Sequence, residues 1–221
     1  EKFRIALTST AKVISEDFEI KKKNDELSSI EVNNLSNPSD FIKLRAETDS
    51  TALKKKFSND LIYKKNLPSN TSSRSLYNIA EKIRYEALGG KMLKGIEKNF
   101  NDNYNEIINN KKKDSLKSKE DVPILEAFEL YMLKNFHEIK LNTLTNKMLN
   151  FWEKDFEQSI DKHKKFLKEN LENQDNYSLK FSQILEEMDI FQNEKENEKH
   201  EENQKQEQNN PSNDDQNNDN E

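Results

Sequence analysis

The chain is a succession of segments in which apolar side chains recur at every third or fourth position. In the first segment, residues 2–14, Phe3, Leu7, Ala11 and Ile14 fall on one face of a helix and charged residues fall on the opposite face. The same spacing recurs along the chain, so the pattern predicts about six helices. We expect an all-α fold, an irregular multi-helix domain in which no repeat of fixed period is apparent.

Polar residues and prolines mark where the early helices start and stop. Asn37 before Pro38 predicts the start of the second helix, because proline suits the first turn of a helix. Breaks are predicted at residues 58–60 and 68–72, and the second stretch supplies side chains that can cap the next helix. Between the first two helices we expect a brief strand over residues 18–22. A loop is expected to follow it over residues 24–37.

The later helices are predicted in the same way. Asp121 before Pro123 indicates the start of a helix whose apolar stripe continues to Phe136. Thr143 is expected to cap the next helix, and the last helix is expected over residues 176–191.

Two apolar stripes predict long continuous helices, over residues 76–107 and residues 144–167. The first stripe passes Gly89 and Gly90. A glycine inside a helix costs about 1 kcal/mol relative to alanine, so this pair predicts either a kink or the close approach of another helix.

Composition divides the chain into two parts. Hydrophobic residues make up only 32% and charged residues 35% of the sequence, and residues 193–221 contain no aliphatic or aromatic side chain. Such a segment cannot offset the entropy of ordering, so we expect an acidic disordered tail after a helical domain over residues 1–192. Ten acids and three lysines give the tail a net charge of −7, which leaves +1 for the rest of a chain whose total is −6.

The sequence argues against a catalytic or cofactor site in this chain. It contains no cysteine, and His137, His163 and His200 do not have the spacing of metal ligands. The run from Gly89 to Met92 lacks the earlier glycine and the hydroxyl residue of a phosphate loop. No serine lies in a strand-to-helix elbow between glycines. We therefore predict no catalytic, cofactor-binding or metal-binding residue here.

Charge and hydropathy also indicate where in the cell the protein is located and which classes of partner it binds. No run approaches the ~18 apolar residues of a membrane span, and no signal peptide is evident, so a cytoplasmic protein without membrane contact is expected. The lysine runs at residues 21–23, 54–56 and 111–113 have acids nearby, and a nearly neutral domain disfavours nucleic-acid binding. Because the sequence begins with Glu1 and not Met, we expect it to be part of a longer reading frame.

Two short clusters mix charged and small residues on helical faces. In the first, over residues 44–53, Arg45 and Asp49 are four apart and can form an ion pair. In the second, over residues 80–92, Glu81 and Arg84 are three apart. The candidate interface or packing residues are Arg45, Glu47, Asp49, Arg84, Glu86 and Gly89.

Two interpretations of the clusters stay open at this point. One is exposed pairing on helix surfaces, which contributes only a few tenths of a kcal/mol per pair. The other is a buried or interfacial network of arginine and carboxylates that fixes helix packing or docks a partner.

These clusters give the sequence its resemblance to a known family. It resembles the N-terminal region of the CobT subunit of aerobic, ATP-dependent cobaltochelatase, in the right order over most of residues 1–192. The matching segments are residues 45–53, residues 83–89 with Met92, Gly95 and Ile96, the opening helix, Phe151-Trp152 and the closing helix at Met188-Asp189. The acidic tail resembles the start of that family's charged linker.

The resemblance implies a non-catalytic subunit of a complex that inserts cobalt into a corrin ring, hydrogenobyrinic acid a,c-diamide, in cobalamin biosynthesis. The implied partners are an AAA+ ATPase subunit and a large corrinoid-binding subunit, and ATP, Mg²⁺ and cobalt are implied for the complex. The family's downstream von Willebrand A domain, with its Asp-x-Ser-x-Ser motif, is absent from this sequence.

Two other functions remain alternatives. The chain is compatible with a free-standing helical scaffold or adaptor of another pathway, since no catalytic constellation is present. A nucleic-acid binder that uses the lysine runs is the third, and it predicts binding that weakens steeply with salt.

Overall fold

The computed structural model describes residues 2–17, 37–111 and 116–188. Every regular element in these residues is a helix, which confirms the prediction of an all-α fold. The elements are α1 (Lys2–Ser15), α2 (Pro38–Phe57), α3 (Asp60–Lys65), α4 (Thr71–Met92), α5 (Lys94–Asn110), η2 (Lys119–Asp121), α6 (Ile124–Phe136), α7 (Thr143–Asn150), α8 (Glu153–Ile160), η3 (Asp161–His163), α9 (Lys164–Glu169) and α10 (Gln174–Glu187).

Some predictions concern parts of the chain outside the described residues. These are the strand at residues 18–22, the loop at residues 24–37 except for Asn37, and the tail at residues 193–221. The chain divides into a compact unit over residues 1–187 and a second unit from residue 188 onward. The helices described below belong to the first unit, and the boundary predicted at residue 192 stays a prediction.

The start of α2 follows directly from its sequence. The side chain of Asn37 accepts a hydrogen bond from the backbone N–H of Asp40 at 3.0 Å, and the Asp40 carboxylate accepts one from the Asn37 N–H at 3.3 Å. Pro38 occupies the first turn, where its missing N–H costs nothing. The helix ends at Phe57, before the predicted break.

The predicted continuous helix over residues 76–107 is wrong. Leu93 is extended, with φ −143° and ψ 120°, and separates α4 from α5. The apolar stripe runs across this break because each helix buries its own face against the same neighbour, α2. Periodicity alone does not register a change of direction between two such helices.

The predicted helix over residues 144–167 is also wrong, since it is divided into α7, α8 and α9. Trp152 lies at the first division, where its indole Nε1–H donates to the carbonyl oxygen of Val122 at 3.0 Å. The cap of α7 is Asn142, whose side chain accepts from the N–H of Thr145 at 2.9 Å, and not Thr143.

Two further helix boundaries differ from the expectation. The six-residue helix α3 lies between the two predicted breaks, where no helix was predicted, and the side chain of Asn59 caps it. The last helix, α10, begins at Gln174, two residues earlier than expected, and ends at Glu187.

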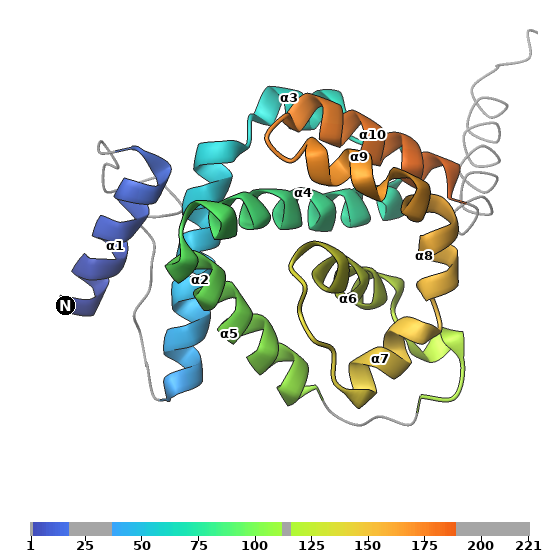
Figure 1. Ribbon diagram of the computed structural model, residues 1–221, viewed down its shortest axis with the longest axis horizontal. Helices are drawn as coiled ribbons and strands as arrows, with labels where there is room; N and C mark the ends of the chain where they lie inside the picture. The colour runs from blue at the N-terminus through green and yellow to red at the C-terminus, as the bar shows by residue number, and fades with distance from the viewer. Residues whose placement is uncertain (1, 18–36, 112–115, 189–221) are drawn as a thin grey trace, which may run out of the picture. The chain divides into compact units, whose positions relative to one another are not determined.

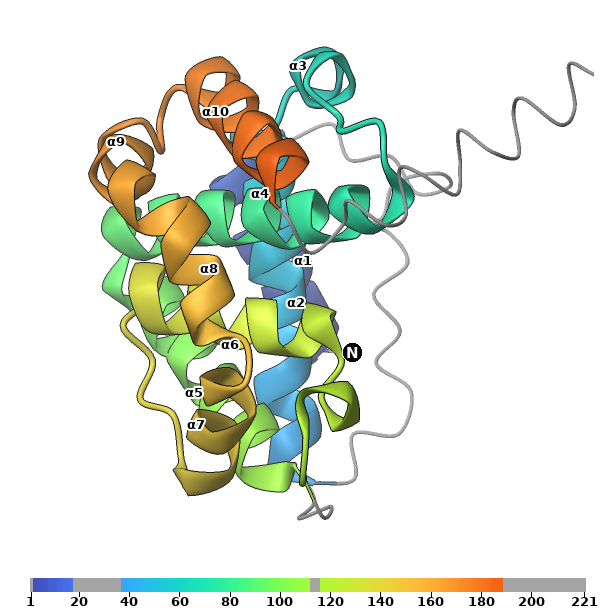
Figure 2. The same cartoon turned by 90° about the vertical axis from the view of Figure 1, so that its right-hand side faces the viewer.

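The helix α4 is the centre of the unit. It crosses α2, and it also packs against α5, α6 and α10 (Figures 1 and 2). Aromatic side chains fill the core beneath it: Phe128 of α6 contacts Phe156 and Phe181 edge-on at centroid distances of 5.4 and 6.1 Å. Each of these rings is fully buried, which contributes about 1.5 to 3 kcal/mol per side chain.

The helix α1 packs against α2 through the predicted stripe, in which Leu7, Ala11 and Ile14 are buried. Within the described part of the chain, no helix has both the length and the apolar character needed to cross a membrane.

Candidate functional site

The two sequence clusters meet where α2 crosses α4. Gly89 of α4 lies directly against Leu53 of α2, so that a Cβ added to the glycine would lie 2.2 Å from the Leu53 Cδ1 atom. The helices approach this closely because residue 89 has no side chain. Of the two predicted explanations for the glycine pair, the close approach of another helix holds at Gly89.

Arg84 lies inside this crossing and is fully buried. Its Nε and Nη2 atoms each donate to one oxygen of the Glu81 carboxylate, both at 2.8 Å. Nη1 donates to the carbonyl of Leu171 at 2.8 Å, and Nη2 donates to the carbonyl of Phe57 at 2.6 Å. The guanidinium therefore joins the end of α2 and the segment before α10 to α4.

Glu81 completes this network from the same helix. Its Oε1 accepts from the hydroxyl of Ser58 at 2.6 Å and from the side-chain amide of Gln174 at 3.0 Å. Gln174 in turn accepts from the backbone N–H of Asn59 at 2.7 Å. A buried arginine and carboxylate with this many partners have their hydrogen-bonding groups satisfied, and their role is to hold helices together.

Glu86, also on α4, does not take part in the network of Arg84 and Glu81 and has different hydrogen-bond partners. Its carboxylate accepts from the hydroxyl of Ser50 on α2 at 2.5 Å and from the hydroxyl of Tyr104 on α5 at 2.6 Å. Burial raises the pKa of Glu86, although the charge of Lys82 acts in the opposite direction. Burial and the adjacent carboxylate also raise the pKa of Tyr104 well above its usual value.

His137 lies behind Glu86 in the interior. Its Nε2 is 3.9 Å from a carboxylate oxygen of Glu86 and has no hydrogen-bond partner. Burial, together with the charge of Lys82, lowers the pKa of His137 to about 4. The imidazole is therefore neutral at physiological pH and does not neutralise Glu86.

The remaining residues of the first cluster divide into buried and exposed positions. Asp49 is buried and accepts from the side-chain amide of Asn99 at 2.7 Å, and burial raises the pKa of Asp49. The exposed Arg45 acts on Asp49 through its charge, which lowers that pKa. Glu47 is exposed and lies 3.7 Å from Lys43.

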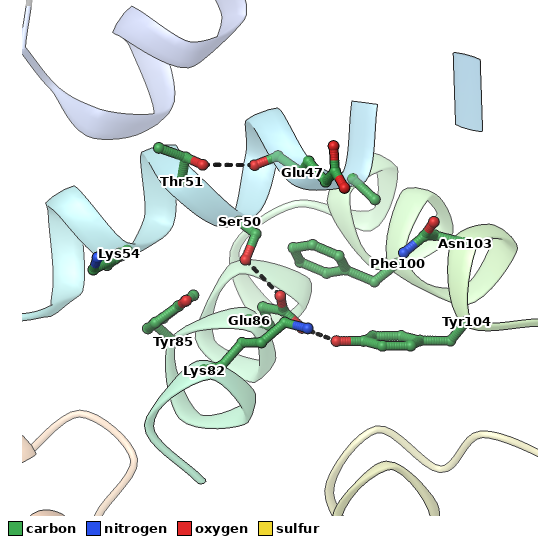
Figure 3. A pocket seen from close by; sticks show the side chains of 11 residues that line it. Glu47, Ser50, Thr51, Lys54, Lys82, Tyr85, Glu86, Phe100, Asn103 and Tyr104 are labelled. Atoms are coloured by element: carbon green, nitrogen blue, oxygen red, sulfur yellow. Dashed lines mark hydrogen bonds between the residues drawn. The ribbon is translucent and has the colours of Figure 1, made fainter. Parts of the chain in front are cut away.

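A hollow of about 420 Å³ opens between α2, α4 and α5, beside Glu86 (Figure 3). Its charged lining residues are Glu47, Lys54, Lys82 and Glu86. The rings of Tyr85, Phe100 and Tyr104 form much of the remaining wall. We call this space the Glu86 hollow. It brings together Glu47 and Glu86, one candidate from each sequence cluster.

The residues that line the Glu86 hollow are suited to binding a ligand. Carboxylates, ammonium groups and aromatic rings lie together there, an arrangement that can bind a charged group. Among the described residues, no group of three or more histidine, aspartate or glutamate side chains is arranged to hold a metal ion.

The described members of the lysine runs pair within the chain. Lys55 lies 2.6 Å from Asp17, Lys56 contacts Glu16, and Lys111 lies 2.5 Å from Glu126. Residues 21–23, 112 and 113 lie outside the described part.

Sequence reasoning missed Ser50, Tyr104 and His137 as neighbours of Glu86. These residues are separated from Glu86 by long stretches of chain and come together only when four helices, α2, α4, α5 and α6, pack. For His137 the sequence does give a local indication of burial, because this residue directly follows Phe136, the last residue of an apolar stripe.

A family model described as "Cobalamin biosynthesis protein CobT" matches residues 1–221. No curated protein and no solved structure matches the chain.

Proposed function

The chain belongs to the CobT family of cobalamin biosynthesis proteins, and from this premise we propose that it is a non-catalytic subunit of ATP-dependent cobaltochelatase. In this proposal the complex inserts cobalt into the corrin ring of hydrogenobyrinic acid a,c-diamide. Cobalt and the corrinoid are its substrates, and the reaction takes place in the cytoplasm. The observation that carries the proposal is the family match over the full length of the sequence.

The proposed partners are an AAA+ ATPase subunit, which binds ATP and Mg²⁺, and a large subunit that holds the corrinoid. The helical unit then serves as an assembly module. The buried contacts of Arg84 and Glu81 support this role, because they fix helices relative to one another and leave none of their polar groups for chemistry.

The exposed candidates are proposed to contact a partner. Arg45 and Glu47 are exposed on α2, and Glu47 lines the Glu86 hollow. Their charges are accessible, whereas Arg84, Asp49 and Glu86 are buried.

Reconstitution tests the proposal. The protein, the AAA+ subunit and the large subunit are purified separately and combined with ATP, Mg²⁺, Co²⁺ and the corrinoid, and cobalt insertion is followed by absorbance. We expect insertion only when all three proteins are present, and no ATP hydrolysis by this chain alone. Full insertion without this chain would remove the proposal and favour an adaptor of another pathway.

A charge reversal tests the surface of α2. Arg45→Glu together with Glu47→Lys is expected to weaken assembly with the AAA+ subunit, as measured by analytical ultracentrifugation. Glu157→Lys on α8, an exposed position remote in sequence, is the control and should assemble normally. Equal assembly of both variants would exclude this surface from the interface.

A further inference from the structure

Glu86 is a buried carboxylate without a cationic partner. It is 1% exposed, and within the described residues no lysine or arginine forms an ion pair with it. Its two close partners, Ser50 and Tyr104, are neutral hydroxyl groups that both donate to it. Removing a carboxylate from water is costly, and buried charges are therefore usually paired.

The Glu86 hollow provides a route by which a counter-ion can reach this carboxylate. Its volume of about 420 Å³ lies within the ordinary range of small binding sites. The rings of Tyr85, Phe100 and Tyr104 line it, and the faces of aromatic rings attract cations. The opening therefore combines a buried negative charge with walls that favour a positive group.

The position of Lys82 shows that the lining of the Glu86 hollow accommodates an ammonium group. Its Nζ lies 5.4 Å from the centroid of the Tyr104 ring and 3.5 Å from the carboxylate of Glu129 on α6. The charge of Lys82 lowers the pKa of Glu86, which shows that it acts on this carboxylate, but the Lys82 ammonium group is paired with Glu129.

An anionic guest is a poorer match to the same lining. It would approach both Glu86 and Glu47, whose side chain is 58% exposed near the opening. The two lysines of the lining are already engaged, Lys82 with Glu129 and Lys54 in an interaction of its own within the chain. Glu47 in turn lies 3.7 Å from Lys43, so, within the described part of the chain, the charge in the hollow that has no ion-pair partner is the carboxylate of Glu86.

We propose that the Glu86 hollow binds the guanidinium or ammonium group of an arginine or lysine side chain from a partner subunit, and that this group forms an ion pair with Glu86. The inference rests on the proposed function only in taking the partner to be a subunit of the chelatase complex. The rings of Tyr85 and Tyr104 hold the cation, and Glu47 attracts it at the opening.

The first test uses a probe and does not depend on any partner. N-acetyl-arginine methylamide is titrated into the full chain while NMR signals of Ser50, Asn103 and Tyr104 are followed, and N-acetyl-glutamate methylamide is titrated in parallel. We expect saturable shifts with the arginine probe alone. Shifts at these positions with the glutamate probe alone, or with neither probe, would overturn the proposal.

Two variants are expected to change the affinity for the arginine probe in opposite directions. Glu86→Gln is expected to weaken binding of the arginine probe about tenfold or more, because a charge-assisted contact is lost. Lys82→Met is expected to strengthen it, because a competing cation is removed, whereas an anionic guest would bind that variant more weakly. Weaker arginine binding to Lys82→Met would contradict the proposal.

Controls separate binding from folding. Glu157→Gln makes the same chemical change at an exposed position on α8 and should leave arginine binding unchanged. If Glu86→Gln does not fold, as judged by circular dichroism, Glu47→Gln at the exposed opening serves in its place and should also weaken binding. Unchanged binding in Glu47→Gln would then count against the proposal.

The second test uses the complex. The affinity of the AAA+ subunit for the wild-type chain and for Glu86→Gln is compared by ultracentrifugation, with a loss of about tenfold or more expected. If the arginine probe binds but no chelatase subunit associates, the proposed function fails and the cation site stands. If the subunits associate, the probe does not bind and Glu86→Gln assembles normally, the cation site fails and the proposed function stands.

Discussion

Arg84 and Glu81 lie one helical turn apart on α4 and form two parallel hydrogen bonds of 2.8 Å between the guanidinium and the carboxylate. The Arg84 side chain is 0% exposed and that of Glu81 is 6% exposed. A two-pronged contact of this kind depends on the planar shape of arginine, which lysine lacks.

Replacement of Arg84 should therefore be strongly destabilising. Arg84→Met leaves the Glu81 carboxylate buried without its cation and also removes the donors to Leu171 and Phe57. We expect a loss of about 3 to 5 kcal/mol in the free energy of unfolding, measured by urea denaturation. Lys65→Met breaks the exposed pair with Asp175 and should cost no more than about 1 kcal/mol. Equal losses in the two variants would show that the buried pair has no special structural role.

Glycine is required at position 89 by the packing of α2. Gly89→Ala would bring a Cβ within 2.2 Å of Leu53, whose side chain is fully buried, and we expect a loss of about 1 to 3 kcal/mol. The control is Gly95→Ala in α5, where no atom lies within 4 Å of the added Cβ. That change should stabilise the protein by about 0.4 to 1 kcal/mol. Thermal unfolding of the two variants side by side gives the comparison, and shifts of the same sign would contradict it.

His137 should make the protein sensitive to acid. Its pKa is lowered from 6.5 to about 4, chiefly by burial. The contribution of His137 to the free energy of unfolding is therefore present above about pH 6.5 and is lost as the pH falls toward 4. The full loss is on the order of 3 kcal/mol. In His137→Phe, the free energy of unfolding should decline less steeply over this interval. An unchanged slope would indicate that another group causes the acid sensitivity.

Glu86 should make the protein less stable as the pH rises, which is the opposite of the effect expected of His137. Its pKa is raised above 4.5 by burial, so its favourable contribution is present below 4.5 and is lost as the pH rises through the raised value. Glu86→Gln keeps the shape of the side chain and removes the titration. We expect the stability of this variant, relative to the wild type, to improve as the pH rises from about 4.5, as measured by urea denaturation at several pH values. A relative stability independent of pH would refute this assignment.

The sequence predicted the helices that carry their own start signals. Asn37 with Pro38 located the beginning of α2, and the polar stretch before α4 contains Asn70, which caps that helix. It did not predict the extended residue Leu93, because leucine has no local preference that would end a helix there. That break depends on how α5 turns to pack against α2, which is a property of the whole fold.

The candidate site was predictable to the extent that its contacts are local. Glu81 and Arg84, three residues apart, could be recognised as a pair from spacing alone. The amide that donates to Asp49 comes from Asn99, and one of the two hydroxyl groups that donate to Glu86 comes from Tyr104. Both donors belong to α5, and no periodicity in α2 or α4 identifies them.

The hydrogen bond from Arg84 to the carbonyl of Leu171 spans 87 residues of sequence. During synthesis, α2 and α4 leave the ribosome well before Leu171 is made, at a rate of about 5 to 20 residues per second. Until then the guanidinium lacks one of its native acceptors, and a buried donor without an acceptor is costly. The crossing of α2 and α4 therefore reaches its final form only after most of the helical unit has been translated, so completion of the chain and completion of this crossing are coupled in time.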